Sequence, residues 1–117
     1  MRIFTIAISA LSIVFGAAAA EAHASLDHAD PSVGSTVPTA PSEISLWFTE
    51  ALEPAFSSVE VLDASGGRVD QGKPQIKAAV MRVELKPLPP GTYKVRWRAV
   101  SADTHKSEGS FSFRVAQ

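Results

Sequence analysis

The sequence contains no cysteine, which excludes disulfide bridges, thiolate metal sites and cysteine nucleophiles. Histidine is scarce, with only three residues, His23, His28 and His105. Charge of either sign is not in excess, because eleven basic and twelve acidic residues give a net charge of −1. Composition therefore gives no reason to expect binding to nucleic acid or to an anionic membrane surface.

One long apolar run is present, and it lies at the N-terminus. Arg2 precedes a run that is mostly apolar up to Ala20, and Ala20-Glu21-Ala22 has the small-x-small pattern of a secretory cleavage site. We therefore predict a signal peptide over residues 1–22, cleaved after Ala22, and an exported domain over 23–117 that is not embedded in the membrane. An uncleaved anchor and cleavage after Ala20 are the alternatives.

Beyond that run, no window of helical length shows an apolar repeat of 3.6 residues. Apolar residues instead alternate with polar ones, as in half-buried strands. The alternating segments are 43–49, 58–63, 81–85, 92–99 and 110–115, with weaker candidates at 23–29 and 73–77. Residues 64–67 (ASGG) predict a hairpin turn that leads into 68–70. The pattern predicts an all-β domain, an antiparallel sandwich or small barrel of about seven strands.

Asp103 and His105 stand two residues apart between the last two predicted strands. In extended backbone, residues i and i+2 project to the same side, so we expect the carboxylate and the imidazole to meet. Such a pair suits a borderline divalent metal ion, although Asp-x-His alone is common. The position between two strands gives the pair a rigid base.

His23 becomes the first residue if the signal peptide is cut after Ala22. Its free α-amine and its ring can then chelate one metal ion with little loss of conformational entropy. With Asp103 and His105, the donors are three nitrogens and one oxygen, a set that suits tetragonal Cu(II) better than zinc. Each histidine taken alone is more simply read as a surface residue that makes one hydrogen bond.

Two other residues are weaker candidates for the same site. His28 is read first as a surface residue and second as an auxiliary ligand, because five residues from His23 it falls on the opposite face of a regular strand. Glu50 is either an outer-shell acceptor that orients a ligating ring or amine, or a solvated carboxylate in a loop.

Several segments together resemble the CopC family of periplasmic copper-resistance proteins. They are 23–26 (HASL), 48–53 (FTEALE), 90–97 (PGTYKVRW), 100–105 (VSADTH) and 109–113 (GSFSF), with Pro31 and Gly34. The resemblance implies an immunoglobulin-like or cupredoxin-like Greek-key fold and a Cu(II) site formed by His23, Asp103 and His105. Some members add a methionine-rich loop for Cu(I). This chain departs from that pattern, because Met81 is the only methionine after residue 22.

The resemblance implies a copper carrier or buffer rather than an enzyme. Its implied partner is an inner-membrane copper transporter of the CopD type or another periplasmic copper protein. One alternative is a copper-dependent oxidative enzyme that uses the N-terminal histidine; against it, the carboxylate of Asp103 would fill a position that such an enzyme leaves open. The other alternative is a metal-free sandwich module for protein contacts.

Overall fold

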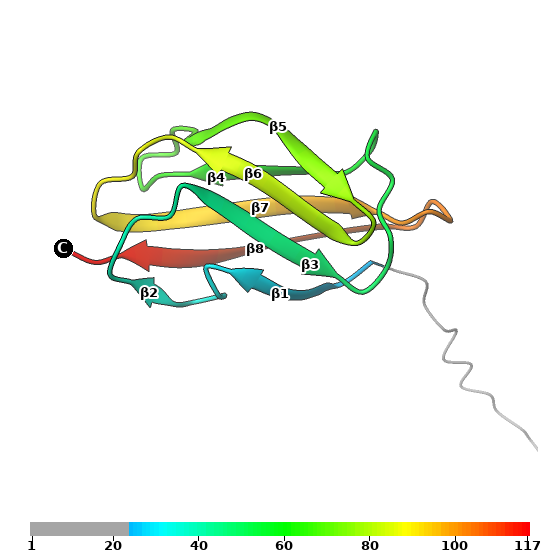
Figure 1. Ribbon diagram of the computed structural model, residues 1–117, viewed down its shortest axis with the longest axis horizontal. Helices are drawn as coiled ribbons and strands as arrows, with labels where there is room; N and C mark the ends of the chain where they lie inside the picture. The colour runs from blue at the N-terminus through cyan, green and yellow to red at the C-terminus, as the bar shows by residue number, and fades with distance from the viewer. Residues whose placement is uncertain (1–23) are drawn as a thin grey trace, which may run out of the picture.

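The computed structural model describes residues 24–117, which fold into two packed four-stranded sheets (Figure 1). The strand order in the first sheet is β1 (Leu26–Asp30), β3 (Glu43–Phe48), β6 (Val80–Leu85) and β5 (Asp70–Lys77). The order in the second sheet is β2 (Thr36–Val37), β8 (Lys106–Val115), β7 (Gly91–Val100) and β4 (Ser58–Leu62). This part of the chain contains no helix that is long and apolar enough to cross a membrane. The all-β prediction is confirmed, and of the two predicted architectures, a sandwich or a small barrel, the structure is the sandwich.

The core lies between the sheets and is formed by the residues that the period-two pattern turns inward. In β7, buried Tyr93, Val95 and Ala99 alternate with the exposed Lys94, Arg96 and Arg98. The inward residues of the other sheet include Ile44, Leu46, Met81 and Val83, all at most 2% exposed. Burial of these side chains supplies the main stabilisation of such a domain, about 1.5–3 kcal/mol for each large aliphatic residue.

β7 and β8 form the longest pairing of the molecule. Their antiparallel register runs without a break from Gly91 opposite Val115 to Val100 opposite Lys106. A bulge-free ladder of this length fixes both the turn at its tip and the side chains on its outer face.

The structure adds one strand to the predicted set and shows where the predicted hairpin turn leads. Residues 24–117 form eight strands rather than about seven, because Thr36–Val37 is a two-residue strand that pairs in parallel with β8. The predicted hairpin turn through 64–67 is confirmed: the Asp63 amide donates to the Gly67 carbonyl at 2.9 Å, the Val69 amide donates to the Val61 carbonyl at 2.8 Å, and Leu62 pairs with Arg68. After this single bridge the chain crosses to the other sheet and begins β5 at Asp70, so the turn does not join two neighbouring strands of one sheet. The Val61 amide donates to Asp70 Oδ1 at 2.8 Å, so a bond to a side chain takes the place of a further backbone–backbone bond between the two segments.

Three connections meet at one end of the sandwich, away from the C-terminus. Figure 1 shows there the start of β1, the connection from β3 to β4 and the turn from β7 to β8. The Ala102 amide donates to the Ala51 carbonyl at 3.3 Å, and Leu52 bridges Ser101, which joins the last two of these connections. The predicted metal-binding turn therefore lies at the same end as two other parts of the chain, the start of β1 and the β3–β4 connection.

Candidate metal centre

The β7–β8 turn brings Asp103 and His105 together. Asp103 Oδ2 lies 3.2 Å from His105 Nδ1. The backbone between them is not extended as predicted: Thr104 has a φ of 71°, and its amide donates to the Ser101 carbonyl at 2.8 Å. The Ser101 amide donates to the His105 carbonyl at 2.9 Å and closes the turn. The two side chains meet because the turn is tight.

The buried Ser101 hydroxyl holds this turn together. Ser101 is 1% exposed, and its hydroxyl donates to Asp103 Oδ1. The Ser101 Oγ atom also lies 3.3 Å from the His105 carbonyl oxygen. The Ser101 hydroxyl, followed by the neighbouring His105, holds the pKa of Asp103 below its ordinary value. Asp103 is therefore an anion throughout the neutral and mildly acidic range, the form in which a carboxylate binds metal.

The pair is accessible as well as close. The side chains of His105 and Asp103 are 56% and 48% exposed. Two donors that each lie about 2.0–2.2 Å from one ion are separated by about 3 Å, so the spacing of this nitrogen and oxygen fits a shared divalent ion. Within residues 24–117, however, no group of three or more histidine, aspartate or glutamate side chains could hold a metal ion. A site with three protein side chains as ligands would therefore need a donor from outside that range.

The start of the described chain lies beside this turn. The Ser107 hydroxyl, on β8, donates to the Ala24 carbonyl at 2.6 Å, and Ala24 is fully buried. Ser25 and Thr49 exchange two further bonds, from the Thr49 amide to the Ser25 carbonyl and from the Ser25 amide to Thr49 Oγ1, each 2.9 Å. His23, the predicted N-terminal ligand, lies outside the described residues.

Glu50 lies on the neighbouring connection between β3 and β4. It is exposed, and the adjacent Ala51 accepts the Ala102 amide next to Asp103. It forms no three-residue cluster with Asp103 and His105. Its role as an outer-shell acceptor stays a prediction.

His28 lies on the outer face of the first sheet. Its ring stacks on Trp47 with centroids 4.4 Å apart and planes 8° apart, and its Nδ1 lies 2.7 Å from the Asp27 carboxylate. The Arg82 guanidinium covers the same indole at 5.9 Å, which explains why Trp47 occupies a polar-face position of its strand. These partners agree with the surface role of His28.

Met81 cannot supply a thioether at the surface, because it is fully buried between the sheets. The residues that sequence reasoning missed are Ser101 and Ser107, whose hydroxyls hold Asp103 and the start of the chain. Their only sequence signal is a serine two residues before Asp103 and another two residues after His105.

Comparison with known proteins gives one consistent family. The CopC domain model matches residues 26–116. Copper resistance protein C of Pseudomonas syringae pv. tomato is 37% identical over 107 residues, which are 84% of either chain. Copper transport protein CutJ of Bacillus subtilis is 34% identical over 111 residues, 92% of this chain but only 20% of CutJ.

Solved structures agree with the sequence matches. CopC from Methylosinus trichosporium OB3b has a TM-score of 0.72 at 34% identity, covering 80% of this chain and 94% of that one. PcoC from Escherichia coli, described as a methionine-rich copper resistance protein, has a TM-score of 0.71 at 37% identity, covering 80% and 99%. Fold, family model and relatives agree, and the chain belongs to the CopC family.

Proposed function

We propose that this protein is a periplasmic Cu(II) carrier or buffer, and that it binds the ion through His23, Asp103 and His105. The observation that carries the proposal is the Asp103–His105 pair, 3.2 Å apart, beside the start of the described chain. Consecutive α-carbons are about 3.8 Å apart, so the bond between Ser107 and Ala24 restricts where His23 can lie. The proposal includes cleavage after Ala22, since only that cut gives His23 a free amine.

The donor chemistry favours copper among divalent ions. An amine, two imidazole nitrogens and a carboxylate form a tetragonal set, and Cu(II) heads the affinity order for such sites. The lowered pKa of Asp103 keeps the oxygen donor ionised. Glu50, on the connection bonded to Ala102, is the proposed outer-shell acceptor. A Cu(I) thioether site has no support, because the one methionine among residues 24–117 is buried.

The names of the relatives support a role in copper handling rather than catalysis. They are copper resistance proteins and a copper transport protein. The CopD-type inner-membrane copper transporter implied by the family resemblance is the proposed partner; CutJ, named a copper transport protein, contains a segment like this chain within a much longer polypeptide. A second periplasmic copper protein is the other candidate recipient.

The test compares two purified N-termini, one chain that begins at His23 and one that keeps Glu21-Ala22. In the second form, the amine, two backbone amides and the His23 ring can wrap Cu(II) locally without the fold. We expect His105→Ala to weaken Cu(II) binding strongly in the first form and little in the second. His28→Ala is the matched control and should change neither.

Asp103→Ala should also weaken binding in the His23 form, but less than His105→Ala, since nitrogen is the better donor for copper. Equal loss from His105→Ala in both forms would remove the requirement for a free His23 amine. Tight binding by the precursor with residues 1–22 attached would refute the proposed site. Intact mass and metal content of the exported protein measure cleavage and cargo together.

A further inference from the structure

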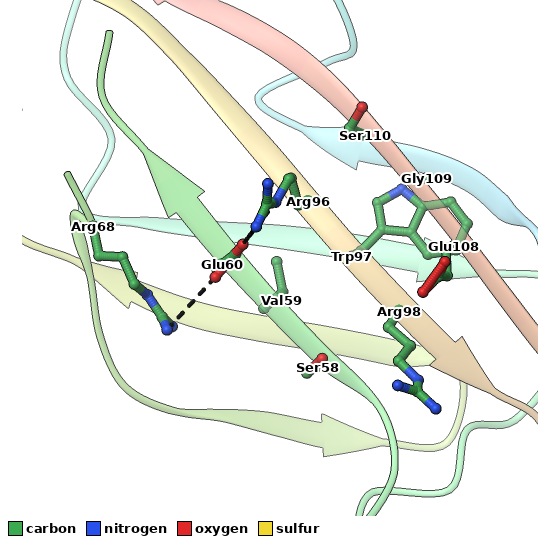
Figure 2. A pocket seen from close by; sticks show the side chains of 10 residues that line it. All are labelled: Ser58, Val59, Glu60, Arg68, Arg96, Trp97, Arg98, Glu108, Gly109 and Ser110. Carbon is green, nitrogen blue, oxygen red and sulfur yellow. Dashed lines mark hydrogen bonds and ion pairs between the residues drawn. The ribbon is translucent and has the colours of Figure 1, made fainter. Parts of the chain in front are cut away.

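The outer face of the second sheet carries a shallow hollow of about 600 Å³ across β4, β7 and β8 (Figure 2). Its charged side chains occupy outward positions that the register aligns. Arg96 lies between Glu60 on β4 and Ser110 on β8, and Arg98 lies between Ser58 and Glu108. None of these residues belongs to the proposed copper site.

Charge is strongly segregated onto this basic face. It carries six cationic side chains and only two carboxylates, Glu60 and Glu108; the cations are Arg68, Lys94, Arg96, Arg98, Lys106 and Arg114. The rest of residues 24–117 carries four cations against nine carboxylates. A net charge of −1 for the chain thus conceals a face of about +4 on a body of about −5.

Two of the arginines are held in place by ion pairs and still stay largely exposed. Arg96 donates to Glu60 through Nε at 2.7 Å and through Nη2, and Arg68 Nη1 lies 3.6 Å from the same carboxylate. Arg68 is anchored on its other side by buried Asp70 at 2.7 Å. Yet Arg68 and Arg96 are still 58% and 55% exposed, so their remaining N–H groups face solvent.

Arg98 differs from these two. Its guanidinium makes no ion pair or hydrogen bond with any residue of the described chain, and Figure 2 shows it directed away from Glu108. An arginine presents five donors in a planar fork that matches a carboxylate, and those of Arg98 are all available. Arg98 is therefore the strongest candidate on this face for contact with an external anion.

We infer that the basic face docks an extended acidic segment of a partner protein, with carboxylates at alternate positions. Arg96 and Arg98 are residues i and i+2 of one strand, so their side chains leave the same face about 6.6 Å apart. An extended segment with Glu or Asp at every second residue has the same repeat, and its carboxylates would face Arg96 and Arg98 together. Glu60 and Glu108 flank this row and would repel carboxylates placed beside it, which fixes the register.

A protein segment fits this face better than a membrane does. The bilayer surface attracts unneutralised polybasic clusters, whereas here two carboxylates stand among the cations and the surface is hollowed. The strongly acidic remainder of the molecule would also oppose approach to an anionic bilayer. The inference does not depend on copper binding.

The experiment uses the metal-free chain beginning at His23 and two peptides of equal composition. One alternates glutamate with threonine, and the other places the same glutamates in one block. Titrations followed by amide chemical shifts should locate the alternating peptide on β4, β7 and β8, with weaker binding of the block peptide. Binding should weaken between low salt and 0.15 M salt, where the screening length is about 8 Å.

Arg98→Gln should lower the affinity for the alternating peptide about tenfold, the effect of losing one charged hydrogen-bonding group. Lys77→Gln, on β5 of the other sheet, makes the same charge change and should leave affinity nearly unaltered. Equal effects of the two substitutions would overturn the inference, as would equal binding of the two peptides or an absence of shifts on this face. Binding to phosphatidylglycerol vesicles that needs Arg98, without peptide binding, would assign the face to a membrane instead.

Discussion

Gly109 is the position where a single methyl group should be most costly. It lies opposite Trp97 in the β7–β8 register, and its φ is not positive, so glycine is not needed there for backbone reasons. A Cβ at residue 109 would lie 2.5 Å from Cζ2 and 2.8 Å from Cε2 of the Trp97 indole. That indole also meets Phe48 edge-on, with centroids 5.2 Å apart. Glycine leaves the space that the ring occupies.

Gly109→Ala would require the indole to retreat by about 1 Å to restore an ordinary carbon–carbon contact. The retreat would disturb its packing against Phe48, and overpacking of this kind costs about 1–3 kcal/mol. A loss of about 2 kcal/mol corresponds to a fall in Tm of roughly 8–16 °C for a domain of this size. Differential scanning calorimetry of the chain beginning at His23 measures it directly.

The effect of Gly109→Ala on the free energy of unfolding should change from destabilising to stabilising when the Trp97 ring is absent. In a Trp97→Leu background no indole opposes residue 109, and replacing a strand glycine by alanine should stabilise by about 0.5–1 kcal/mol. The two single variants and the double variant form a thermodynamic cycle with a coupling of about 2.5–3 kcal/mol. An unchanged cost of Gly109→Ala in the Trp97→Leu background would refute the reasoning.

Three further predictions concern single residues. Ser101→Ala should raise the pKa of Asp103, because the hydroxyl that lowers this pKa is lost. Ser57→Ala is the control: it removes a nearby hydroxyl that is bonded to the Val100 amide and should leave the pKa of Asp103 unchanged. NMR titration of the carboxyl groups measures both effects. Burial raises the pKa of Asp70, but its bonds to Arg68 and the Val61 amide outweigh that effect and the net pKa is lowered. The ionised Asp70 carboxylate should therefore contribute about 1–3 kcal/mol to the free energy of unfolding above about pH 4, and this contribution should be lost as the pH falls below that value. The difference in unfolding free energy between the parent and Asp70→Asn should accordingly shrink in acid. Met81→Leu should leave Cu(II) affinity unchanged and cost less than about 1.5 kcal/mol in urea denaturation, because Met81 is a core residue.

Strand positions could be predicted from the sequence because a strand that is buried on one face has apolar and polar residues in alternation. The pairing of strands could not, because it depends on long-range contacts: β5 has a weak pattern, and its Gly72 has a φ of 77° where the register with β6 shifts. β2 was missed since two residues are too few for a period.

Asp103 and His105 were predicted as neighbours, but for the wrong backbone reason. The Asp-x-His spacing suits both an extended strand and the tight turn observed, in which Thr104 has a positive φ. The supporting hydroxyls were not predictable, because Ser107 contacts Ala24, 83 residues away in the sequence. The basic face was equally hidden, since total charge says nothing about which strand faces outward.

The copper proposal and the docking inference meet on one hairpin. Arg98 lies two residues before Val100, the last residue of β7, and Lys106 directly follows His105. The unbroken β7–β8 ladder makes the outer face and the turn one rigid unit. An acidic segment bound along Arg96 and Arg98 would therefore end beside Asp103 and His105, whose side chains are about half exposed at that tip. If the proposed copper site is correct, a partner docked in this way would need no movement of the sandwich to reach an ion held at the turn, because recognition on the face would already orient the partner toward it.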